Sequence, residues 1–299
     1  MIQRRWFLKL SAAGAGCLLW RDEARSWLHP GGVPALRVQP QRGASRSAFD
    51  AFGAAWEVEP HAGRVVERGP LGIALRAIGE PGSGPAQLNQ PRAIGFGPDE
   101  NLYVLDSGNS RIQVFDRRGV HVRQLGCPGG GDGELRAPRD LAFDREGRLW
   151  VADTSNHRIS VFDLLGKASA RTAALGDGRL DLNAPCALAF APDGRLHVLD
   201  AGNRRVSVFS PNGLPQGSYG EGTLQEPSAL ALAADGCAYV ADRRKASLEV
   251  FEPGGRHLRE LRAHFADGSA AAPQHVCFAP DGELHVDARR AACSGSAAA

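Results

Sequence analysis

Carboxylate and amide side chains recur at one fixed spacing in this 299-residue sequence. The pairs in the pattern Asp-x-x-Asn are Asp106 with Asn109, Asp153 with Asn156, and Asp200 with Asn203. Oxygen ligands of this kind suit Ca²⁺, so a ring of calcium ligands is one interpretation. A residue that every repeat requires is explained more simply as part of the scaffold. We predict that these side chains satisfy backbone N–H groups of a turn, and that the arginine after each pair, such as Arg111, binds a nearby carboxylate.

Other candidates for chemistry are few. His275 and His285 are expected on successive strands, and Glu221 lies outside the repeated positions. Two histidines without a third ligand are a weak zinc signal. The glycine-rich stretch 127–133 lacks the G-K-[ST] of a phosphate-binding loop, and the sequence holds no G-x-S-x-G or H-E-x-x-H motif. We therefore predict no catalytic residue and no metal ligand, with Ca²⁺ kept as the alternative cofactor.

These residues lie within a longer repeat that begins with proline. Its copies start at Pro91, Pro138, Pro185 and Pro227, and a shortened copy starts at Pro273. A period of about 40–50 residues that contains several short strands is typical of β-propeller blades. In the first copy the expected strands are 93–96, 102–105, 112–115 and 120–125, separated by turns that contain Pro, Asp or Gly. The sequence predicts an all-β propeller of four-stranded antiparallel blades.

The repeated phrase resembles the NHL repeat, in which a proline-led strand precedes V-x-D-x-x-N-x-R-I-x-V-F. The resemblance covers about residues 64–287 and is close in the first three copies. The fourth copy departs from it, because Arg-Arg-Lys at 243–245 replaces the x-x-Asn turn and Ser247 replaces the arginine. NHL propellers commonly have six blades. We therefore expect six, with five blades closed by joining the chain ends as the alternative.

The first residues resemble a bacterial twin-arginine export signal. The matching residues are Arg4, Arg5, Phe7, Leu8 and Lys9. The apolar stretch that follows is too short to cross a hydrocarbon core of about 30 Å, so we expect no stable transmembrane span. The resemblance implies that the twin-arginine translocase exports the folded protein to the periplasm or beyond. We divide the chain into a signal peptide (1–35), a linker or degenerate first-blade strands (36–63), the propeller (64–290) and a disordered tail (291–299).

Binding residues are expected where strand two turns into strand three and where the chain enters strand one. Both connections emerge on the same side of a blade, which we call the loop face. The predicted binding residues on the loop face are Arg92, Arg139, Asp106, Asn109, Asp153, Asn156, Asp200, Asn203 and Arg243. Loops on a rigid scaffold are where binding usually occurs.

The net charge of +2 argues against a nucleic-acid partner. Our first hypothesis is an exported scaffold that binds a protein, peptide or glycan through its loop face and the mouth of the central channel. The alternative is a metal-dependent propeller enzyme similar to lactonases or peptide-amidating lyases.

Overall fold

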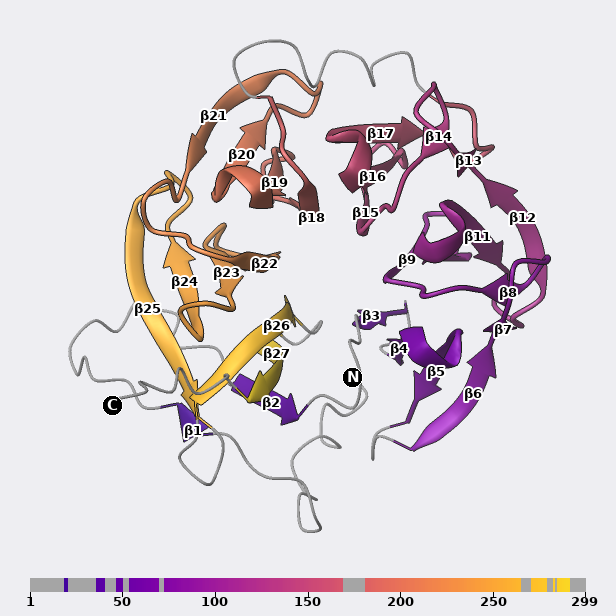
Figure 1. Cartoon of the computed structure of the whole chain (residues 1–299), viewed down its shortest axis with the longest axis horizontal. Helices are drawn as coiled ribbons and strands as arrows, with labels where there is room; N and C mark the ends of the chain where they lie inside the picture. Colours follow the sequence, from indigo (N-terminus) through magenta and orange to yellow (C-terminus); the bar gives the residue numbers. More distant parts are fainter. Residues whose placement is uncertain are drawn as a thin grey trace, which may run out of the picture.

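The protein is a ring of antiparallel sheets that stand radially around a central axis (Figure 1). The computed structural model describes residues 19–20, 36–40, 47–50, 54–69, 73–168, 181–264, 270–278, 282 and 284–290. The described residues contain no α-helix, and none of them forms a helix suited to spanning a membrane. The short 3-10 turns are η1 (Pro60–Ala62), η2 (Ser107–Asn109), η3 (Thr154–Asn156) and η5 (Ala201–Asn203). The predicted all-β propeller with four-stranded antiparallel blades is confirmed.

Five blades follow one another around the ring. Blade 1 contains β3 (Ser47–Phe49), β4 (Ala55–Glu59), β5 (Arg64–Arg68) and β6 (Ala74–Ile78). Blade 2 contains β9 (Ala93–Phe96), β10 (Leu102–Asp106), β11 (Arg111–Phe115) and β12 (His121–Leu125), and blade 3 contains β15 (Asp140–Phe143), β16 (Leu149–Asp153) and β17 (Arg158–Phe162). Blade 4 contains β18 (Pro185–Phe190), β19 (Leu196–Asp200), β20 (Arg205–Phe209) and β21 (Pro215–Tyr219). Blade 5 contains β22 (Pro227–Leu232), β23 (Ala238–Asp242), β24 (Ser247–Phe251) and β25 (His257–His264).

A hairpin fills the sector between blade 5 and blade 1 (Figure 1). This closing hairpin consists of β26 (Ala270–Phe278) and β27 (Leu284–Arg290). β2 (Leu36–Pro40) pairs in parallel with β27, and β1 (Leu19–Trp20) pairs with the end of β25. Segments from both ends of the sequence therefore meet in this sector. The five blades and the closing hairpin fit the expectation of six or five blades.

Two short parallel pairs lie in the loops that enter blades 2 and 3. They are β7 (Glu80–Pro81) with β8 (Gln87–Leu88), and β13 (Cys127–Pro128) with β14 (Glu134–Leu135). The glycine-rich stretch 127–133 thus forms part of the loop that leads into β15. It opens no helix, as the sequence predicts.

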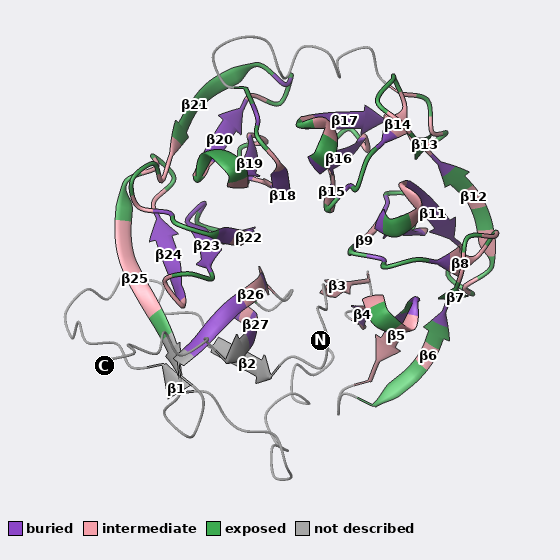
Figure 2. Cartoon of the chain, viewed as in Figure 1, coloured by how far each residue is buried: buried purple, intermediate pink, exposed green. Residues whose placement is uncertain are grey.

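Burial explains why most residues of the inner strands are apolar. All five residues of β10 and of β16 are buried, because each blade packs on a neighbour through both faces. The outer strand β12 instead alternates between exposed and covered residues (Figure 2). Gly119, with φ of 83°, closes the turn from β11 to β12 in the left-handed region that glycine tolerates.

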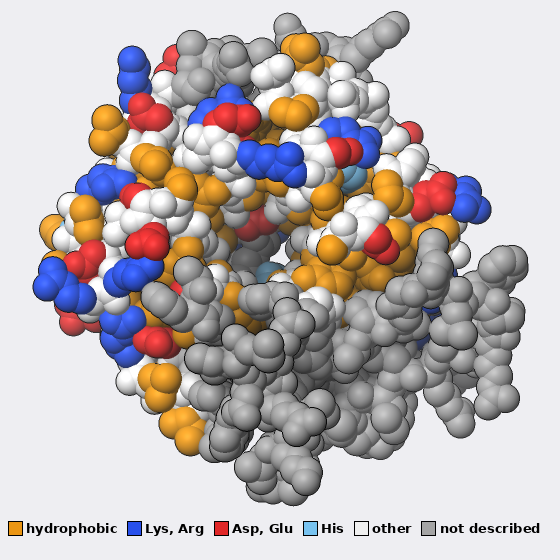
Figure 3. Space-filling model, turned by 180° about the vertical axis from the view of Figure 1, so that it is seen from behind, with side chains coloured by type: hydrophobic (Ala, Val, Ile, Leu, Met, Phe, Trp, Pro, Cys, Tyr) orange, Lys and Arg blue, Asp and Glu red, His pale blue; other side chains and the backbone are white. Residues whose placement is uncertain are grey.

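Hydrophobic clusters fill the five boundaries from blade 1 through to the closing hairpin. The boundary between the closing hairpin and blade 1 is different. By strand register, His275, Cys277, His285 and Asp287 share one face of the hairpin, and His285 lies edge-on to Phe49 of blade 1 with ring centroids 6.0 Å apart. Among the described residues, this boundary holds none of the clusters. The ring therefore closes at a polar seam, and its centre is hollowed on the face shown in Figure 3.

Candidate functional site

The repeated aspartate is the centre of a buried hydrogen-bond network, seen most fully in blade 3. Asp153 is fully buried, and its Oδ1 accepts a hydrogen bond of 2.7 Å from the backbone N–H of Arg136. Its Oδ2 accepts hydrogen bonds from Asn156 Nδ2 at 2.8 Å and from Arg158 Nε at 2.9 Å. Asn156 Nδ2 also donates to the carbonyl of Gly129 at 2.9 Å. The network ties the loop that enters blade 3 to the end of β16.

Arg158 explains the glycine-rich stretch. Its guanidinium donates to the backbone carbonyls of Gly130, Gly131 and Glu134 at 2.7–2.9 Å. The carbonyl oxygens of this loop thus face a cation of the blade, so the stretch supports the fold. The hydrogen bonds from the charged Arg158 side chain are stronger than hydrogen bonds between neutral groups.

Blades 2 and 4 repeat this arrangement around Asp106 and Asp200, both fully buried. The predicted pairing of arginine with a carboxylate is confirmed, and the carboxylate is the repeat's own aspartate. The predicted partners of these aspartates are corrected. In blades 2 to 4 the backbone N–H that donates to the aspartate belongs to the incoming loop, as with Asn89, and not to the turn itself.

Asp106, Asp153 and Asp200 lie where β10, β16 and β19 end at the loop face, but their side chains are fully buried there. With no exposed surface, these carboxylates have no access to a ligand. The amides of Asn109, Asn156 and Asn203 each donate both to the aspartate and to a loop carbonyl. Both hydrogens of each amide are thereby used within the fold. The repeated Asp and Asn build the blade, which is the structural role that the sequence favours.

The three predicted arginines are exposed, as the binding hypothesis requires. Arg92 and Arg139 lie just before β9 and β15, where their backbone N–H groups donate to strand carbonyls. Arg243 forms an ion pair with Glu226, with an N–O distance of 2.5 Å. All three stand at the loop face.

Blade 5 replaces the network with different residues. Within the described ranges, no arginine side chain pairs with Asp242, which instead accepts hydrogen bonds from backbone N–H groups, including those of Gln225, Arg244 and Lys245. The cation is supplied by Lys245, whose Nζ lies 2.6 Å from the buried carboxylate of Glu249. Burial lowers the pKa of Lys245, but its hydrogen bonds to Glu249 and a second glutamate raise it above the usual value. Because Lys245 supplies the cation, Arg244 is not needed in the network.

A pocket lies at this departure from the repeat, between blades 4 and 5. Its volume is about 440 Å³, within the usual range for small-molecule sites. It is lined by Asn203, Arg204, Glu221, Gly222, Leu224, Gln225 and Arg244. The turn after β19, the loop before β22 and the turn after β23 supply these residues. All three connections belong to the loop face.

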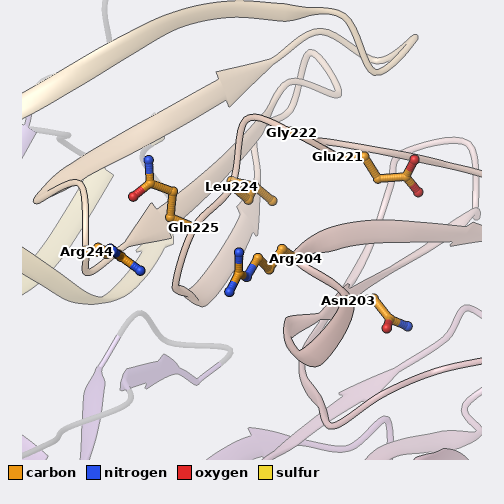
Figure 4. Close-up of a pocket in the computed structure, with 7 residues that line it drawn as sticks. All are labelled: Asn203, Arg204, Glu221, Gly222, Leu224, Gln225 and Arg244. Carbon is orange, nitrogen blue, oxygen red and sulfur yellow. The ribbon is translucent and has the colours of Figure 1, made fainter.

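Figure 4 shows that Arg204 and Arg244 point toward one another across the pocket. The side chain of Glu221 points away from them, and its carboxylate accepts a hydrogen bond of 2.8 Å from Ser218 Oγ. Leu224 is almost fully buried and gives the pocket an apolar part. Sequence reasoning predicted Asn203 and considered Glu221, but it missed the two facing arginines and Leu224. The departure at 243–245 was the signal that could have located them.

The three metal candidates named from the sequence do not all come together. Glu221 lies between blades 4 and 5, whereas His275 and His285 lie on the closing hairpin. His275 Nδ1 is 3.8 Å from Asp287 Oδ2, and desolvation raises the pKa of the adjacent Cys277 thiol to about 12. That thiol is therefore protonated at neutral pH and is a poor nucleophile. In the part of the chain that the structure describes, no three His, Cys, Asp or Glu side chains are arranged to hold a metal ion.

Comparison with known proteins supports this description of the fold. The NHL repeat model matches residues 88–115 and 135–162, which end with β11 and β17. The chain is thus a β-propeller in which the repeats at 88–115 and 135–162 match the NHL model. No curated protein sequence gave a significant match.

Solved structures of lyases share the propeller over most of their length. One is described as a streptogramin B lyase structure, with a TM-score of 0.63 and 12% identity, covering 83% of this chain and 91% of that one. A catalytically inactive virginiamycin B lyase from Staphylococcus aureus with quinupristin has a TM-score of 0.62 and 16% identity, covering 94% of each chain. The TM-scores establish a common fold, but at identities this low they do not show a common function, which depends on the site.

Proposed function

We propose that this NHL-repeat propeller is an exported binding module that holds a protein, peptide or glycan through its loop face. The observation that carries the proposal is the pocket between blades 4 and 5. It lies where the repeat departs from its own pattern, and two of its lining side chains, Arg204 and Arg244, are not used in building the blades. The buried networks of blades 2 to 4 keep the surrounding loops rigid. Rigid loops favour binding because they lose little conformational entropy when a ligand binds.

A photo-crosslinking amino acid at position 139 is expected to capture a partner from periplasmic extract in a saturable manner. The matched control is position 118, also an exposed arginine, in the β11–β12 turn on the opposite side of the blade. Adding the charge reversal Arg92→Glu to the protein that carries the crosslinking amino acid at position 139 should weaken capture at least tenfold, because a hydrogen bond to a charged group contributes about 1.5–3 kcal/mol. Equal capture at positions 139 and 118 would contradict a loop-face site.

An enzyme is the second candidate function. The solved structures with this fold include lyases, and what this chain shares with them is the propeller fold. A metal-dependent activity similar to that of lactonases or peptide-amidating lyases requires a bound ion. Stoichiometric Ca²⁺ or Zn²⁺ in the purified protein, measured by mass spectrometry, would favour the enzyme, and metal-free protein that still captures its partner would favour the binding module.

Export through the twin-arginine translocase is part of the proposal. Arg4 and Arg5 lie outside the described residues, and the resemblance of 4–9 to the signal supports their role. The double variant Arg4→Lys with Arg5→Lys is expected to accumulate in the cytoplasm, whereas Arg21→Lys, a control outside the motif, should be exported normally. Cell fractionation and immunoblotting measure the distribution. Normal recovery of the double variant from the periplasm would refute export by this route.

A further inference from the structure

The pocket between blades 4 and 5 contains two cations that the fold does not neutralise. Arg204 and Arg244 both line it, and within the described ranges neither guanidinium has a hydrogen-bond or ion-pair partner. Their neighbours in sequence are different, because Arg205 pairs with Asp200 and Arg243 pairs with Glu226. The structure thus keeps these two charges available to a ligand.

Neither arginine is a requirement of the repeat. Counting from the repeated aspartate, the place of Arg244 is taken by Gly108, Ser155 and Gly202 in blades 2 to 4. The corresponding places of Arg204 are Ser110, His157 and Ala246. The other blades form the turn at each of these places without an arginine. The two side chains therefore serve something other than the turn.

The geometry gives the pocket a positive character. The guanidiniums point toward one another, while the one acidic side chain of the lining, Glu221, points away and is held by Ser218 and Arg205. A concavity lined by charges of one sign concentrates the field and attracts ions of the opposite sign. Each guanidinium also presents a planar fork of N–H donors that matches the oxygen atoms of carboxylates and phosphates.

We infer that this pocket binds a small anionic ligand by clamping a carboxylate or phosphate group between Arg204 and Arg244. The ligand chemistry deepens the proposed function and rests on it, because the pocket is part of the loop face. The buried Leu224 adds an apolar contact for the rest of the ligand. The volume of about 440 Å³ leaves room for a molecule considerably larger than the anionic group alone.

Calorimetric titration at low ionic strength tests the inference with two probes, citrate for carboxylates and inorganic pyrophosphate for phosphates. We expect saturable binding of at least one probe, and the probe that binds identifies the chemistry. Arg204→Gln and Arg244→Gln should each weaken binding about tenfold or more, since each removes a charge-assisted hydrogen bond. The matched control is Arg136→Gln, an exposed arginine on the same face outside the pocket, which should leave the affinity unchanged. Unfolding temperatures of all variants verify that they are folded.

Two outcomes would overturn the anion site: no saturable binding of either probe, or equal affinity in the Arg204→Gln, Arg244→Gln double variant. The crosslinking test at position 139 separates this failure from failure of the proposed function. Persistent capture without anion binding rejects the pocket chemistry and leaves the loop-face function standing. Anion binding without capture supports the pocket and rejects a macromolecular partner at the loop face.

Discussion

Replacing Asp200 by alanine is expected to lower the free energy of unfolding by about 3–5 kcal/mol, as when one partner of a buried ion pair is removed. The carboxylate of Asp200 is fully buried and accepts hydrogen bonds from Asn183 N, Asn203 Nδ2 and Arg205 Nε at 2.7, 2.8 and 2.9 Å. Alanine would leave these donors without an acceptor and the charge of Arg205 without its buried partner. Urea unfolding followed by circular dichroism measures the loss.

Asp193 supplies a matched control in the same blade. It also pairs with an arginine, Arg195, at 2.7 Å, but about half of its side chain is exposed (51%). Solvent screens such a pair, so Asp193→Ala should cost less than about 1 kcal/mol. Similar losses for Asp193→Ala and Asp200→Ala would show that the buried network does not hold the blade together.

Acid is expected to destabilise the protein through His197. This side chain is buried in β19, its Nδ1 lies 2.9 Å from Tyr219 Oη, and its Nε2 has no hydrogen-bond partner among the described residues. Burial, reinforced by the charge of Arg195, lowers the pKa of His197 from 6.5 to about 4. Between pH 6.5 and pH 4 His197 therefore binds a proton in the unfolded chain but stays neutral in the folded chain. The free energy of unfolding should fall by up to about 3 kcal/mol from this group between pH 6.5 and pH 4.

His197→Phe should remove that part of the pH dependence, since phenylalanine cannot titrate. Tyr219→Phe is the matched control, because it deletes the hydroxyl partner and leaves a buried histidine that still titrates. We expect the difference in unfolding free energy between wild type and His197→Phe to shrink or reverse as the pH falls, with no such trend for Tyr219→Phe. Parallel pH profiles for wild type and His197→Phe would contradict the assignment.

The fold was predictable because each blade repeats the same local chemistry. Proline-led strands, Asp- and Gly-containing turns and largely apolar inner strands occur at one period, so the copies support the same interpretation. The expected strand 102–105 corresponds to β10, and 120–125 corresponds to β12 with a difference of one residue. Upstream of the first clear copy, the segment 36–63 contains β4, and β5 and β6 lie just after residue 63.

The candidate site was less predictable, because it depends on contacts between blades. Arg204 and Arg244 are separated by a whole repeat, and no local pattern shows that they face one another. The partner of the repeated aspartate was equally hidden: Asp153 accepts the N–H of Arg136, a residue that precedes it by 17 positions. A repeat identifies what every blade needs. The functional residues were to be sought where one blade departs from the others.

An electron-density map from crystals soaked in citrate or pyrophosphate tests most directly the central claim, that binding uses the departures from the repeat and not the repeat itself. We expect density for the anion between the guanidiniums of Arg204 and Arg244, with the network around Asp153 unchanged. Density for the anion at the repeated Asp and Asn positions or in the central hollow, with only water between the two arginines, would contradict it.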